Sequence, residues 1–234
     1  MKGTANSKNK WFMGMIYNIR QLLFNSAYQT KEGNKRAAYL AHFAQIFPDS
    51  PYADQALGVA AATYQQMQNT PKMLETANGL LAKDPNNLGM LILLADYYSE
   101  KGEQLDKAEA SAKKAIAVLG TAKKPEGLTD EQWTQQSGLQ KGLALSALGQ
   151  VYLQKKNNVG AVENFKTASP LLKPDAGSYA RNQYRLAFAL LNLKKITDAK
   201  AALTDAASVN SPYKQPALDK LKALNAAVAA KAKS

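Results

Sequence analysis

The stretch between residues 142 and 174 constrains the fold more than any other part of the sequence. Its large apolar and small residues recur at steps of three and four, before and after the polar turn 155–158. Residues spaced in this way share one face of a helix, so the stretch predicts two helices, each with one apolar face. Small residues on these faces allow the two helix axes to approach closely. The defining positions are Leu145, Leu148, Gly149, Tyr152, Ala161, Phe165, Ala168 and Pro174.

This spacing resembles the tetratricopeptide repeat (TPR), whose pattern is W-x2-L-G-x2-Y, then A-x3-F, then P. Leu145 stands in place of the tryptophan, and Pro174 lies about one place late. One such hairpin cannot bury its own apolar face, so it must stack on similar neighbours. The resemblance implies an all-α fold, an α-α superhelix or right-handed solenoid of about five helix hairpins with a C-terminal capping helix.

Further copies of the pattern flank this stretch. Ala60 and Leu94 occupy equivalent positions 34 residues apart, which is the TPR period. Leu148 follows Leu94 by 54 residues, and Leu186 follows Leu148 by 38. We place a single repeat array at residues 18–212. Residues 1–17 form an N-terminal flanking segment and the start of an amphipathic helix. Residues 213–234 form a capping helix and a basic tail. The repeats lie near 18–53, 54–87, 88–119, 142–179 and 180–212, with an insertion at 120–141.

The insertion at 120–141 predicts a loop followed by an overlong first helix, from about residue 130 to residue 154. Thr129 and Gln132 have the spacing of a capping box, in which each side chain bonds the other's backbone N–H. Insertions in repeat arrays fall on one face, often the binding face. An equal alternative is that the insertion supports the convex side of the repeat array.

Apolar residues also recur at helical spacing near the N-terminus, from Trp11 to Leu23. Asn18 and Arg20 interrupt the run and no clear A-x-A cleavage site follows it, so we do not expect a signal peptide. We also do not expect a membrane-spanning helix, which needs roughly 20 apolar residues. We expect this amphipathic helix to pack against the first repeat. The alternative is peripheral membrane contact through residues 11–23, because Trp11 and Phe12 adjoin lysines.

The net charge of +12 is concentrated at the two ends of the chain. Residues 1–30 carry +4 and residues 179–234 carry +7, while the middle is nearly neutral. Basic termini are more often solvated helix faces than nucleic-acid sites, so a nucleic-acid partner is not expected.

The sequence offers no candidate catalytic constellation. It lacks cysteine and has one histidine, His42, which we expect at or near the surface. No GxSxG, HExxH or phosphate-binding glycine-rich motif is present. We therefore expect no enzyme activity, no cofactor and no metal site.

The resemblance to TPR proteins implies a protein or peptide partner in a concave groove lined by the first helices of the hairpins. Within it, Arg181 and Arg185 over aromatic side chains predict a site for a carboxylate or an acidic peptide. Alternatively, the C-terminal helix covers Tyr184 and Phe188 and leaves only the arginines exposed. Chaperone-type carboxylate clamping is not expected, because its lysine and asparagine are absent. The candidate groove residues are Gln65, Asp96, Gln150, Arg181, Tyr184, Arg185 and Phe188.

The segment Phe43–Leu57 resembles the junction found in TPR proteins of the bacterial cell envelope, including outer-membrane assembly lipoproteins and Tol-associated periplasmic proteins. This resemblance favours a bacterial envelope or periplasmic location over the cytoplasm. We therefore expect a noncatalytic scaffold. The alternative is a basic adaptor that binds an anionic polymer or a membrane surface through its termini.

Overall fold

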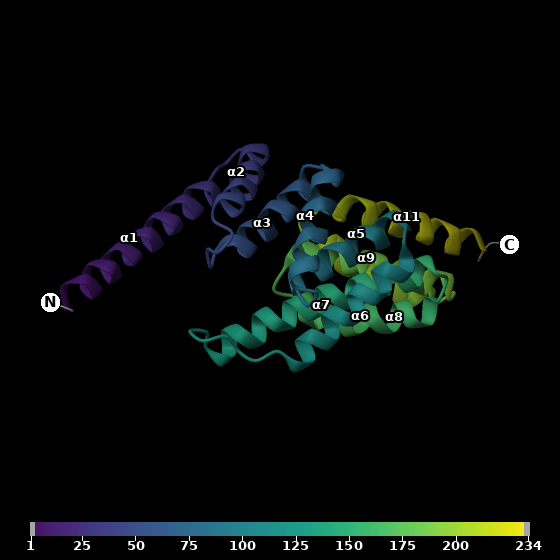
Figure 1. Ribbon diagram of the computed structural model, residues 1–234. Coiled ribbons are helices and arrows are strands. Elements are labelled where there is room, and N and C mark those ends of the chain that lie inside the picture. Colours follow the sequence, from purple (N-terminus) through teal and green to yellow (C-terminus); the bar gives the residue numbers. More distant parts are fainter. Residues whose placement is uncertain (1–2, 232–234) are drawn as a thin grey trace. The chain divides into compact units, whose positions relative to one another are not determined.

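The computed structural model describes the backbone of residues 3–231 and the side chains of residues 10–227. Within that range every regular element is an α-helix, and the helices are numbered α1 to α11 in chain order. Figure 1 colours them from purple at the N-terminus to yellow at the C-terminus. The predicted all-α fold class is confirmed. The chain forms two compact units, Met1–Met90 and Leu91–Ser234, here called unit 1 and unit 2. The predictions for the polar start and the basic tail fall partly outside the described residues.

Unit 1 has an aromatic cluster near the C-terminal end of its first helix. Phe24 lies with its ring centroid 5.9 Å from that of Phe43 and 5.1 Å from that of Tyr52, onto which it stacks. Buried aromatic pairs of this kind contribute about 1 kcal/mol beyond the area that they bury. The helices of this unit are α1 (Gly3–Tyr28), α2 (Gly33–Ile46), α3 (Ala53–Gln66) and α4 (Thr70–Lys83).

Helix α1 packs against its neighbours through one side of its C-terminal half, from Tyr17, whose hydroxyl lies 2.8 Å from that of Tyr52, onward. Phe24 and Ala27 are buried, whereas Trp11 is 71% exposed and Leu22 is 68% exposed. In Figure 1 the first half of α1 extends beyond α2 and α3 of the same unit. The expectation that this helix packs against the first repeat therefore holds for its C-terminal half, whereas Trp11 and Leu22 remain exposed. The cause is length, because α1 is a 26-residue helix while α2 has 14 residues. None of the described helices combines the length and the hydropathy of a membrane-spanning segment.

Unit 2 consists of helix pairs that stack in chain order. The pairs begin with α5 (Leu88–Lys101), which starts in unit 1, and α6 (Leu105–Thr121). The others are α7 (Asp130–Gln154), α8 (Asn158–Leu172), α9 (Ala176–Asn192), α10 (Ile196–Ser208) and the final helix α11 (Lys214–Lys231).

Helices α7 and α8 approach closely at Gly149, as their small residues predict. A Cβ atom at Gly149 would lie 2.8 Å from the ring of Phe165, which is completely buried. Ala161 and Ala168 on the same face of α8 are also completely buried. The glycine therefore provides the space that the Phe165 ring fills.

The turn after each first helix has the same hydrogen-bonded structure in four successive hairpins. The amides of Asn69, Glu103, Asn157 and Lys195 donate to the carbonyls of Tyr64, Tyr98, Tyr152 and Leu190. This six-residue bond defines the Schellman motif, in which the preceding residue is left-handed. Those left-handed residues are Gln68, Gly102, Lys156 and Lys194, with φ between 56° and 67°. Their separations of 34, 54 and 38 residues reproduce the repeat spacing of the sequence.

The insertion forms a loop at residues 122–129, after which α7 begins with the predicted capping box. The hydroxyl of Thr129 accepts from the Gln132 amide at 3.1 Å, and the Gln132 side chain accepts from the Thr129 amide at 2.9 Å. Leu139 and Leu143, near the end of the insertion, pack on the core around Leu172. This end of the insertion therefore braces α8.

Candidate functional site

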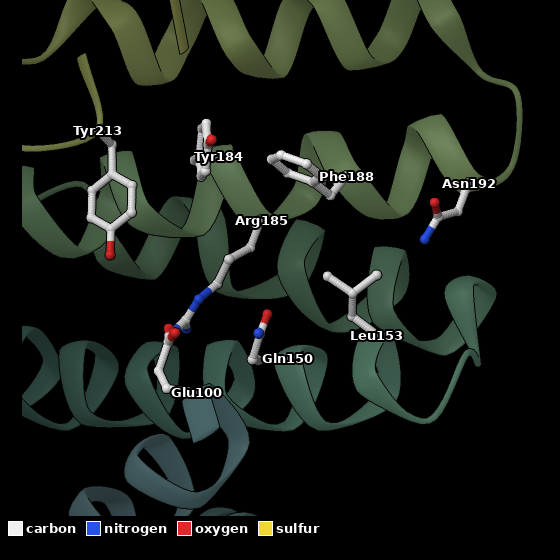
Figure 2. Close-up of a pocket in the computed structure, with 8 residues that line it drawn as sticks. All are labelled: Glu100, Gln150, Leu153, Tyr184, Arg185, Phe188, Asn192 and Tyr213. Carbon is white, nitrogen blue, oxygen red and sulfur yellow. The ribbon is translucent and has the colours of Figure 1, made fainter. Parts of the chain in front are cut away.

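A pocket of about 350 Å³ lies among the first helices of unit 2 (Figure 2). Helices α5, α7 and α9 each contribute to it, and Tyr213 just before α11 completes it. It is lined by Glu100, Gln150, Leu153, Tyr184, Arg185, Phe188, Asn192 and Tyr213. Its volume suits one or two side chains of a bound molecule.

Asp96 of α5 joins both predicted arginines of α9. Its Oδ2 lies 2.9 Å from Nη1 of Arg181, and its Oδ1 lies 3.4 Å from Nη2 of Arg185. Arg185 also pairs with Glu100 and donates to the Ser146 hydroxyl at 3.5 Å. Two carboxylates thus neutralise two guanidinium groups within the chain. An acidic guest would have to displace Asp96 or Glu100, so these arginines are not a ready-made carboxylate site.

The ion pairs at Asp96 are largely screened from water, because its side chain is only 16% exposed. Burial alone would raise the pKa of the Asp96 carboxyl, but the charges of Arg181 and Arg185 and their hydrogen bonds outweigh it. The pKa of Asp96 is therefore lowered. For Arg181, burial would lower the pKa, but Asp96 reverses the effect and raises it. The ionised forms are the stable ones at neutral pH.

Aromatic side chains form the opposite wall of the pocket. Tyr184 and Phe188 meet edge to face with ring centroids 5.0 Å apart, and Tyr213 lies 5.5 Å from Tyr184. The ammonium of Lys220 on α11 lies 5.2 Å from the centre of the Phe188 ring. Tyr184 and Phe188 are half-buried and still face the pocket. The alternative that α11 leaves only the arginines exposed is wrong, since Arg185 is only 5% exposed.

Gln150 on α7 brings an unpaired acceptor to the pocket. The residue is 8% exposed, and its Oε1 atom has no hydrogen-bond partner among the described residues. In Figure 2 its amide lies between the side chains of Arg185 and Leu153. A buried amide oxygen without a partner costs on the order of 1–3 kcal/mol. A guest that donates a hydrogen bond here would recover part of that cost.

The predicted groove residues therefore separate into three groups. Gln150, Tyr184, Arg185 and Phe188 line the pocket, whereas Asp96 and Arg181 lie behind it in the ion-pair cluster. Gln65 is a half-buried residue of unit 1 and is not among the pocket residues. Sequence analysis missed Glu100, Asn192 and Tyr213. Leu153, one turn after Gln150 on α7, falls on a groove position that the repeat pattern gives to first helices.

Among the described residues, no group of three or more His, Cys, Asp or Glu side chains is placed to hold a metal ion. His42 is exposed, as expected, and lines a separate pocket of unit 1.

The fold is that of a tetratricopeptide-repeat protein. The chain resembles the crystal structure of PilW, a widely conserved type IV pilus biogenesis factor, with a TM-score of 0.59 and 15% identity over 82% of this chain and 77% of PilW. It also resembles TTC0263, a thermophilic TPR protein of Thermus thermophilus, with a TM-score of 0.54 and 16% identity over 89% of this chain and 98% of that one. Nearly identical TPR-like repeats from Podosopora anserina match with a TM-score of 0.52 and 16% identity, over 82% of this chain and 93% of theirs. No family model and no curated protein matches the sequence.

Proposed function

We propose that this protein is a noncatalytic scaffold that binds a protein or peptide partner in the pocket of unit 2. The observation that carries the proposal is the combination of an aromatic wall with the unpaired Gln150 oxygen. The fold supports it, because solved structures with this fold are repeat proteins and such repeats present extended binding surfaces.

The chemistry of the pocket favours an uncharged anchor on the partner. An aromatic or aliphatic side chain would pack against Tyr184 and Phe188, as anchor residues do in protein interfaces. A main-chain N–H beside that anchor would donate to Gln150 Oε1. The arginines take an indirect part: Arg185 forms one side of the pocket while Asp96 and Glu100 hold its charge.

Selection from a random peptide library with the immobilised full chain tests this proposal. We expect the selected peptides to share one aromatic or aliphatic position and no requirement for acidic residues. Phe188→Ala should weaken binding of a selected peptide roughly tenfold or more. Gln150→Leu, which keeps the side-chain size, should also weaken it. Tyr39→Ala, an exposed aromatic residue of unit 1, is the matched control and should leave the affinity unchanged.

Two results would count against the proposal. One is enrichment of acidic carboxyl-terminal peptides, which would indicate that the guest displaces the carboxylates of Asp96 and Glu100. The other is a selected peptide whose affinity is insensitive to both Phe188→Ala and Gln150→Leu in variants that melt at the wild-type temperature.

We also propose the bacterial cell envelope as the compartment. Support comes from the Phe43–Leu57 junction and from the shared fold with PilW, a pilus biogenesis factor. Fractionation of the source cells with an antibody to the chain tests this, and recovery in the cytosol alone would contradict it.

A further inference from the structure

Helix α1 presents a continuous apolar face that no described residue covers. Trp11, Met15, Ile19 and Leu22 follow one another at steps of four, four and three, so they share one side of the helix. Their exposed fractions are 71%, 37%, 46% and 68%, and the adjacent Phe12 and Leu23 are 51% and 45% exposed. Exposed apolar patches of this extent mark interaction sites.

The apolar face continues onto α2 of the same unit. Leu23 lines a pocket of about 210 Å³ together with Tyr39 and Ile46 of α2, which are 51% and 52% exposed. The whole surface therefore runs along α1 and across the first hairpin without an acidic side chain among its lining residues.

Every charged residue of the chain up to the end of α1 is basic. Residues 1–30 contain Lys2, Lys8, Lys10 and Arg20 and no acidic residue. Arg20 stacks over the ring of Phe47 at 5.3 Å, and neither Lys10 nor Arg20 forms an ion pair with a described residue. A second copy of the chain would place like charges together if the two α1 faces met, which disfavours self-association.

We propose that α1 docks on the surface of an anionic phospholipid bilayer, with Trp11, Ile19 and Leu22 in the headgroup boundary. Aromatic and aliphatic residues on one side of a helix, with basic residues nearby, are the chemistry of interfacial helices. The basic residues supply attraction to the negatively charged headgroups. The site is separate from the pocket of unit 2, so it does not depend on the proposed partner-binding function.

Sedimentation of the full chain with lipid vesicles tests this inference. We expect binding to vesicles of about 30% phosphatidylglycerol in phosphatidylcholine and binding weaker by roughly tenfold or more on pure phosphatidylcholine. Binding should also weaken as salt rises. In a Trp133→Phe background Trp11 is the sole tryptophan, and its emission should shift to shorter wavelength only with the anionic vesicles.

Leu22→Asp places a charge on the apolar face of α1 and should reduce binding at least about tenfold. Val159→Asp is the matched control, because Val159 on α8 is 67% exposed, and it should bind as wild type. Lys10→Glu tests the electrostatic attraction to the headgroups separately, and it should weaken binding to anionic vesicles only.

Three outcomes would overturn the inference. The first is no binding to anionic vesicles at millimolar lipid. The second is binding that Leu22→Asp and Lys10→Glu leave unchanged, which would assign it to another surface. The third is concentration-dependent self-association that Leu22→Asp abolishes, which would make a second copy the occupant.

Discussion

Nη1 of Arg181 lies 2.9 Å from Oδ2 of Asp96, a residue 85 positions earlier in the chain. This ion pair joins the first helix of one hairpin to the first helix of the hairpin two places later. Arg185, one turn along α9, pairs with the other oxygen of the same carboxylate. Both oxygens of a single carboxylate thus bind the helix that carries Tyr184 and Phe188.

Asp96→Asn is expected to destabilise the protein by about 3 kcal/mol, because it leaves the partly buried Arg181 without its counter-charge and takes one of two carboxylates from the buried Arg185. Equilibrium unfolding in urea measures the difference. Asp106→Asn is the control, since Asp106 pairs with Lys155 while 98% exposed, and its effect should be several times smaller. Equal effects for the two substitutions would show that the Asp96 cluster does not stabilise the fold.

The stabilisation by Asp96 should also depend on pH. Its pKa in the folded protein lies below the ordinary value of 3.8, so the unfolded chain takes up the proton first as the pH falls. The contribution is complete above about pH 5 and is lost as the pH falls through the lowered folded-state value. The difference in unfolding free energy between wild type and Asp96→Asn should therefore shrink between about pH 5 and about pH 2. A constant difference across that interval would contradict the lowered pKa.

Gly149→Ala is expected to destabilise the protein by about 1–3 kcal/mol, because its methyl group would meet the buried Phe165 ring. The gain in helix propensity of about 1 kcal/mol offsets only part of this. Gly138→Ala in the same helix makes an ordinary contact, 3.8 Å from Leu171, and should be neutral or stabilising. Thermal melts of both variants give the comparison, and a stable Gly149→Ala variant would mean that α7 and α8 can separate without cost.

Thr129→Ala removes the acceptor for the Gln132 amide and is expected to cost about 1 kcal/mol. The loss should be local, because residues 130–132 are exposed. Amide hydrogen exchange should therefore speed up in the first turn of α7 and stay unchanged near Gly149. Uniformly faster exchange along α7 would show that the capping box supports the whole helix.

Much of the fold follows from local spacing. The capping box at Thr129 and the small residue at Gly149 are set by neighbours within one hairpin, so the sequence predicts both. The ion-pair partner of Arg181 is not local, because it depends on how the hairpins stack. Repeat spacing placed both Asp96 and Arg181 in the groove, but it could not show that they bind one another. The exposure of Trp11 could not be predicted either, because periodicity identifies an apolar face but does not show what covers it.

The Schellman turns offer positions at which the stability of the fold can be changed without altering the pocket. Only Gly102 fills its left-handed position with the residue that suits it, whereas Gln68, Lys156 and Lys194 are exposed side chains that bear a conformational cost of roughly 1 kcal/mol each. Converting these three to glycine would repeat what Gly102 already does, at turns outside the pocket lining. Because glycine also loses more conformational entropy on folding, the net gain is smaller than that cost, but the more stable background would let destabilised variants of Asp96 or Phe188 be purified and measured for ligand affinity.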